Sequence, residues 1–136
     1  MPKISGYQVF IDHDTPSDTQ VITDRGILHV NLIDIPSSVD RRTGRCYELA
    51  GVFQQNNEAW TVVHAITRPP VGPSWAGKDF DHAFAERDGV VFDPVFAEFF
   101  PLEEFYAIYG VTDARKYDSK TAARLLLKEN LWGPWR

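Results

Sequence analysis

The chain has 136 residues, of which 43% are hydrophobic and 13% aromatic, and its formal net charge is -5 at pH 7. This length fits a single domain over residues 1–136, and the apolar content argues against disorder. The acidic excess argues against a nucleic-acid-binding protein, which usually carries a basic face. The sequence lacks both an apolar run of roughly 20 residues and the apolar centre of a signal peptide, so we expect a cytoplasmic protein that does not enter a membrane. Delivery of the protein as an effector stays an open alternative.

The N-terminal third predicts two short strands, over residues 6–11 and 27–33. The turn-rich segment 14–20 lies between them. Residues 35–45 predict a polar loop that ends at Gly44-Arg45. Asn31 and Thr43 are possible donors to an oxyanion, but no motif marks either of them.

A helix is predicted over residues 46–56, because Cys46, Leu49 and Phe53 recur at helical spacing on one apolar face. Residues 60–67 predict a strand near the centre of a sheet, because this segment is almost wholly apolar and rich in β-branched side chains. Residues 68–81 predict a long loop with three prolines, and loops of this length are often functional.

A hairpin is predicted from residues 82–86 and 90–93, because Asp88-Gly89 separates the two apolar runs. A helix follows over residues 101–110, with Pro101 at its first position. The last predicted helix covers residues 119–130, with Ser119 as its N-cap.

The single cysteine, Cys46, excludes an internal disulfide and a thiolate-rich metal site. A lone cysteine is most often a small buried side chain, and the apolar face of the predicted helix is compatible with that role. Cys46 also opens the helix directly after Arg45. Helix N-terminal N–H groups and a neighbouring cation stabilise a thiolate, which is the nucleophilic form. Its position therefore favours a catalytic cysteine.

The hairpin brings a histidine and an aspartate to one face of the sheet. With a two-residue loop, Arg87 pairs with Val90 and Glu86 with Val91, so His82 and Asp93 become diagonal neighbours. A four-residue loop would place His82 and Asp93 directly opposite each other, and either register brings the two side chains within reach. An imidazole can take the proton of a thiol, and a carboxylate can orient the imidazole and stabilise its charged form. The alternative is an ordinary surface hairpin with an exposed histidine.

Three segments, GRCYELAGVFQ, WTVVHAIT and HAFAERDGVVFDP, resemble the papain-like cysteine hydrolase superfamily, in particular its transglutaminase-like branch among small bacterial and phage proteins. The resemblance covers about residues 44–95 and rests on Cys46, His82-Ala83-Phe84 and Asp93-Pro94. It implies an α+β fold in which the catalytic-cysteine helix packs on an antiparallel β-sheet. It also implies a triad of Cys46, His82 and Asp93 that transfers an acyl group from an amide.

Two further residues are candidates for substrate binding. Trp75 lies in the long loop and could cover or stack on a substrate, or simply anchor the loop. His64 lies in the strand 60–67 and could line the site, although such a histidine is more often part of the core. A metal site of His64, His82 and Asp93 is a further alternative, but the spacing matches no known zinc pattern. We expect no metal and no organic cofactor.

The sequence thus predicts a cysteine peptidase, an amidase or a glutamine deamidase or transglutaminase, with a protein or peptide as its substrate. A catalytically silent binding or inhibitory module of the same fold is the alternative from another class. Acyl transfer from a small thioester donor is a second enzymatic alternative. Reactivity of Cys46 separates the silent module from the enzymes.

Overall fold

The computed structural model describes residues 5–68 and 78–135 and shows an α+β protein with two antiparallel sheets. The described part of the chain forms, in order, β1 (Gln8–Phe10), the 3-10 helix η1 (Pro16–Asp18), β2 (Thr19–Thr23), β3 (Gly26–Val30), α1 (Val39–Arg42), α2 (Cys46–Asn56), β4 (Thr61–Thr67), β5 (Phe80–Arg87), β6 (Val90–Asp93), β7 (Glu98–Pro101), α3 (Leu102–Ile108), β8 (Thr112–Tyr117) and α4 (Ser119–Glu129). None of the helices in these ranges is long and apolar enough to cross a membrane.

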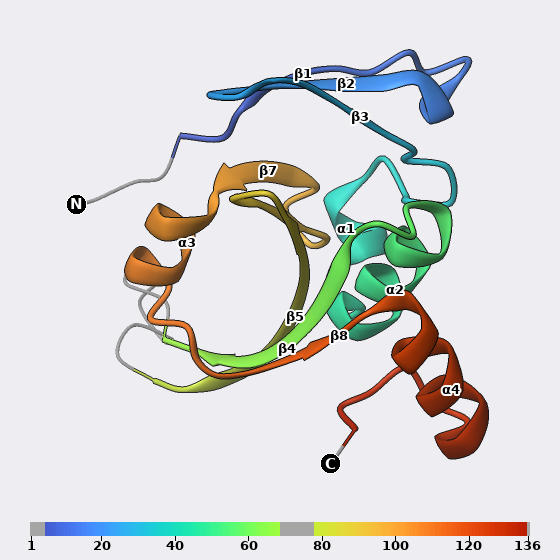
Figure 1. The fold of residues 1–136 in the computed structure, drawn as a ribbon, viewed down its shortest axis with the longest axis vertical. Helices are drawn as coiled ribbons and strands as arrows, with labels where there is room; N and C mark the ends of the chain where they lie inside the picture. Colours follow the sequence, from blue (N-terminus) through green and yellow to red (C-terminus); the bar gives the residue numbers. More distant parts are fainter. Residues whose placement is uncertain (1–4, 69–77, 136) are drawn as a thin grey trace.

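The larger sheet has the strand order β7-β6-β5-β4-β8, and all its neighbours are antiparallel. It curls strongly, and α3 and α2 lie at its two sides (Figure 1). Phe105 of α3 packs with Val63 and Phe84, whereas Ala50 of α2 packs with Val62. Since neighbouring residues of a strand point to opposite faces, the two helices cover opposite faces of the sheet.

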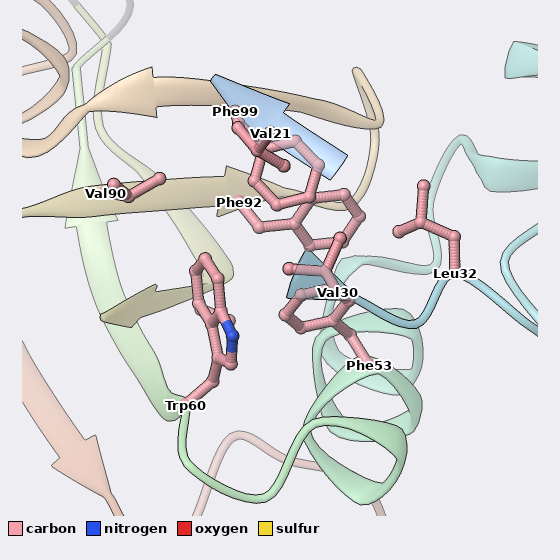
Figure 2. Packing of buried hydrophobic residues seen from close by; sticks show 9 residues of the cluster. Val21, Val30, Leu32, Phe53, Trp60, Val90, Phe92 and Phe99 are labelled. Carbon is pink, nitrogen blue, oxygen red and sulfur yellow. The ribbon is translucent and has the colours of Figure 1, made fainter. Parts of the chain in front are cut away.

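The smaller sheet, β1-β2-β3, lies across one end of the larger sheet and of α2 (Figure 1). Between them is an apolar cluster to which both sheets and α2 contribute (Figure 2). Phe53 of α2 stacks on Phe92 of β6 with ring centroids 4.2 Å apart, and Val21 and Val30 cover them from the smaller sheet. Full burial of one such aromatic side chain contributes about 2–3 kcal/mol, so this cluster fixes α2 against the strands.

Several predicted elements are confirmed. The helix over residues 46–56 has the predicted bounds, and its apolar face is buried at Leu49, Ala50 and Phe53. The strand over residues 60–67 is confirmed as β4, an inner strand that begins one residue later. The predicted hairpin is β5 and β6, although β5 begins at Phe80, inside the segment predicted as a loop.

The strands predicted over residues 6–11 and 27–33 are confirmed as the shorter β1 and β3. Other predictions are wrong. The strand β2 was predicted as turn and connecting segment. The loop predicted over residues 35–45 contains α1. The strands β7 and β8 were not predicted, because β7 has four residues and β8 is a polar edge strand.

Both C-terminal helices begin differently from the prediction. Pro101 is the last residue of β7 and the N-cap of α3, not its first helical residue. The N-cap of α4 is Asp118, whose side chain accepts a hydrogen bond from the Thr121 N–H at 2.8 Å, and Ser119 is the first helical residue. A carboxylate is as effective an N-cap as a hydroxyl, so the aspartate takes this place.

Candidate active site

Cys46 is the first residue of α2, directly after a tight turn. Gly44 has a φ of +79°, a conformation that glycine adopts without strain, and the Arg45 N–H donates to the Arg42 carbonyl at 3.2 Å. No side chain caps the helix, and the first hydrogen bond of α2 runs from the Leu49 N–H to the Arg45 carbonyl. The earlier N–H groups of the helix lack helical partners and point toward its N-terminal end, where the partly exposed Cys46 lies.

The predicted register between His82 and Asp93 is confirmed. Arg87 pairs with Val90 and Glu86 with Val91, as a two-residue loop requires. The Nε2 atom of His82 lies 2.7 Å from the Oδ2 atom of Asp93. The exposed fraction of the side chain is 18% for His82 and 1% for Asp93, so the contact is shielded from water.

The other carboxylate oxygen of Asp93 is held by the main chain. Its Oδ1 atom accepts hydrogen bonds from the N–H groups of Val95 at 2.9 Å and of Phe96 at 3.2 Å. The Asp93 carbonyl accepts from the Ala97 N–H at 2.8 Å. These bonds close the turn between β6 and β7 around the carboxylate, and they fix the direction in which Oδ2 faces His82.

Asp93 determines the charge of His82. Burial alone would lower the pKa of His82, but the charge and the hydrogen bond of Asp93 outweigh it, and a smaller contribution comes from Cys46. Together they raise the pKa of His82 to about 10. The imidazole is therefore positively charged at neutral pH.

Cys46 is the second residue that interacts with the His82 side chain. A side-chain hydrogen bond between Cys46 and His82 contributes to the raised pKa of the histidine. Because Nε2 faces Asp93, Nδ1 is the ring nitrogen that can exchange a proton with the thiol. His82 thus interacts with both Asp93 and Cys46, and a cation beside a cysteine favours the thiolate.

Arg45 does not act as the expected free cation beside Cys46. Its guanidinium pairs with Glu48 at 2.9 Å, one turn along the same helix, and donates to the Arg41 carbonyl at 2.8 Å. The guanidinium therefore faces Glu48 and the Arg41 carbonyl, and the positive charge that interacts with Cys46 is that of His82.

His64 lies in a largely aromatic environment. Its side chain is buried, and its ring centroid lies 4.7–5.0 Å from the rings of Tyr47, Tyr117 and Trp135. Neither ring nitrogen has a hydrogen-bond partner among the described residues. Burial lowers the pKa of His64 to about 4, so the ring is neutral at pH 7. These contacts fit a core residue better than a substrate-binding one. Trp75, the other candidate, lies outside the described residues.

The metal site considered for His64, His82 and Asp93 is not formed. Within residues 5–68 and 78–135, no three histidine, cysteine or acidic side chains form a group that could hold a metal ion. His82 and Asp93 bind each other, and His64 lies among aromatic rings.

Two features of the site were missed by sequence reasoning. Arg42, in the segment predicted as a polar loop, is buried and bonded to the turn that holds Asp93. The same turn leaves Phe96 about half exposed beside Tyr109, with ring centroids 6.2 Å apart. Burial and the charges of Asp93 and Glu98 raise the pKa of Tyr109, so its hydroxyl stays neutral near the carboxylate. In the sequence, the adjacent pair Asp93-Pro94 was the only local signal for the turn between β6 and β7.

Comparisons of the chain with protein-family models, with curated proteins and with solved structures found no match.

Proposed function

We propose that this protein is a thiol-dependent enzyme that transfers an acyl group from an amide bond, with Cys46 as its nucleophile. The observation that carries the proposal is the contact of the His82 ring with the Asp93 carboxylate at 2.7 Å, together with the interaction between His82 and Cys46 that contributes to the raised pKa of the histidine. Each residue has the chemical type and the neighbour that its role needs. The papain-like, transglutaminase-like core is part of the proposal, supported by a helix that opens with the cysteine and packs on β4 and β5 of the antiparallel sheet that carries the other two residues.

In the first step, the Cys46 thiolate, whose proton has passed to His82, attacks the carbonyl carbon of the amide. A carbon–sulfur bond forms, and the electron pair of the carbonyl moves to its oxygen. The uncapped N–H groups at the start of α2 are suitable donors for this oxyanion, because they are preorganised and need no reorientation during the reaction.

The intermediate collapses when His82 gives its proton to the leaving nitrogen. The carbon–nitrogen bond breaks, the amine departs and a thioester remains on Cys46. Water, or an amine in a transferase, then attacks the thioester and gives its proton to His82, and the thiolate is released. Asp93 stabilises the imidazolium at both stages and holds the ring in one orientation.

The experiment offers the full chain three kinds of substrate: peptides with a chromogenic C-terminal amide, a glutamine peptide with and without an added amine, and an acyl thioester. We expect turnover of at least one of the two amide classes. Cys46→Ala and His82→Ala should each lower it by roughly a thousandfold or more. His29→Ala is the matched control, because His29 is an exposed histidine on β3, and it should leave turnover unchanged.

The outcome also separates the alternatives. Turnover of the thioester alone would replace the amide proposal with acyl transfer from a thioester donor. If no substrate is turned over and Cys46 reacts with iodoacetamide only after unfolding, the catalytically silent binding module becomes the better interpretation.

A further inference from the structure

Arg42 lies between the two halves of the candidate site. It is the last residue of α1, four positions before Cys46, and the exposed fraction of the residue is 8%. Its Nε atom donates to the Val95 carbonyl at 2.9 Å, and its Nη1 atom donates to the Pro36 carbonyl at 2.9 Å. Both acceptors are main-chain carbonyls, so the guanidinium joins three separate stretches of chain.

Val95 connects Arg42 to Asp93. The Val95 carbonyl accepts from Arg42, while the Val95 N–H donates to the Oδ1 atom of Asp93 at 2.9 Å. Arg42 therefore holds the same residue that orients the carboxylate. Since Oδ2 of Asp93 faces His82 at 2.7 Å, a shift of the turn would move the carboxylate away from the imidazole.

The main chain of Arg42 acts on the other half of the site. Its carbonyl accepts the Arg45 N–H at 3.2 Å, in the turn that leads into Cys46. Arg42 is thus hydrogen-bonded both to the turn that leads into α2 and to the turn after β6, although these segments are about 50 positions apart in the sequence. A planar guanidinium with several fixed donors suits this task better than an ammonium, which is a flexible point charge.

We infer that Arg42 is a positioning residue, which keeps the Asp93 carboxylate against His82 and registers the Asp93 turn with the start of the Cys46 helix. The catalytic consequence of this inference rests on the proposed function, but the placement of Asp93 does not. The charge of His82 reports that placement directly, because Asp93 is the main group that favours the imidazolium.

The sign of the effect distinguishes positioning from charge. Removal of a cation by itself reduces the repulsion on the imidazolium and raises the pKa of His82. Loss of the contact with Asp93 lowers it. The groups that face His82 from the neighbouring elements are Asp93 of β6 and Cys46 of α2. The experiment therefore measures the pKa of the His82 ring directly.

The test is an NMR titration of the histidine rings in the full chain, with the His82 signal assigned by its absence in His82→Ala. In Arg42→Gln we expect the pKa of His82 to fall by about one unit or more. In Arg42→Lys, which keeps the charge and can reach one carbonyl, the fall should be smaller. Arg41→Gln is the matched control, because Arg41 is exposed on the same helix, and it should leave the titration of His82 unchanged.

An unchanged or raised pKa of His82 in folded Arg42→Gln would overturn the inference. If Arg42→Gln does not fold, the same criterion applies to Arg42→Lys below its melting temperature. The proposed function is judged separately: a lowered pKa in a protein without amide turnover keeps the positioning role and refutes the enzyme. If amide turnover survives in Arg42→Gln and the pKa of His82 is unchanged, the positioning role is refuted and the proposed function stands.

Discussion

The Nε2 atom of His82 lies 2.7 Å from the Oδ2 atom of Asp93, although both residues lie beyond the last pair between β5 and β6, which is Ala85 opposite Phe92. They are diagonal neighbours on one face. The geometry of the hairpin brings them together, and the hydrogen-bonded turn after Asp93 aims the carboxylate. The charge of the imidazole therefore depends on a local arrangement that single substitutions can change.

Asp93→Asn should lower the pKa of His82 from about 10 toward the ordinary value near 6.5. The amide can still form a hydrogen bond, but it cannot stabilise the imidazolium. Amide turnover should fall roughly 10²–10⁴-fold, as expected when the orienting carboxylate of a triad is lost. NMR titration and steady-state kinetics measure the two effects. Asp88→Asn, in the loop of the same hairpin, should change neither, and an unshifted His82 in folded Asp93→Asn would contradict the assigned role.

The same contact should make stability fall at alkaline pH. Since the pKa of His82 is higher in the folded chain than in the unfolded chain, the stabilisation is fully present below about pH 6.5 and is lost as the pH rises through about 10. The free energy of unfolding should drop by at most about 1.4 kcal/mol per pH unit in this window. The free energy of unfolding is measured by chemical denaturation at each pH. The measurement uses Cys46→Ala, because this variant has no thiol that could titrate in the same pH range. Adding Asp93→Asn should flatten the curve, and equal slopes with and without Asp93 would refute the coupling.

Alkylation of Cys46 should depend on His82. With a charged imidazole beside the sulfur, iodoacetamide should react with the folded protein at pH 6, where an ordinary thiol reacts slowly. His82→Ala should lower this rate about tenfold or more, because it removes the nearest positive charge. The rate is followed by mass spectrometry from pH 5 to 9, with folding checked at each pH. His29→Ala should match the wild type, and coincident profiles for wild type and His82→Ala would show a thiol that is merely packed.

Local sequence patterns predicted the parts of the site that depend on local rules. The spacing of Leu49, Ala50 and Phe53 identified α2 with its bounds, and Asp88-Gly89 fixed the register of β5 and β6. A helical face and a two-residue hairpin are determined by neighbours in sequence, so a single chain is enough to read them.

The rest depends on contacts between distant segments. Arg42 looks like a surface residue of a polar loop until the turn at Val95 is placed against it. The edge strand β8 carries Arg115 and Lys116 and lacks apolar alternation, because charged side chains on an edge prevent pairing with other chains. His64 looked like a possible site residue, and only the rings of Tyr47, Tyr117 and Trp135 packed around it show that it lies in a covered, aromatic environment.

His64 should weaken the protein in acid. Its pKa of about 4 is lower than that of an unfolded histidine, so the unfolded chain binds more protons, and stability falls as the pH drops from about 6.5 through about 4. The full loss is about 3 kcal/mol. His64→Phe removes the titration and two unpartnered polar atoms, and a neighbouring cavity of about 20 Å³ gives the ring space to adjust. This variant should be at least as stable at pH 7 and should lose less stability between pH 7 and 5. A wild-type curve that is flat over this range, or parallel to that of the variant, would contradict the prediction.

Gly51→Ala should destabilise the protein, although the same change in an exposed helix stabilises by about 1 kcal/mol. A Cβ atom at Gly51 would lie 2.6 Å from Cζ3 of Trp132, whose indole covers α2 from the C-terminal segment. Either the ring moves away or the helix shifts, and overpacking of this kind costs roughly 1–3 kcal/mol. Trp132→Ala removes the obstacle, so adding Gly51→Ala to it should be neutral or stabilising. Thermal and denaturant unfolding of the wild type, both single variants and the double variant form a complete cycle. The contact is refuted if Gly51→Ala has the same effect with and without Trp132.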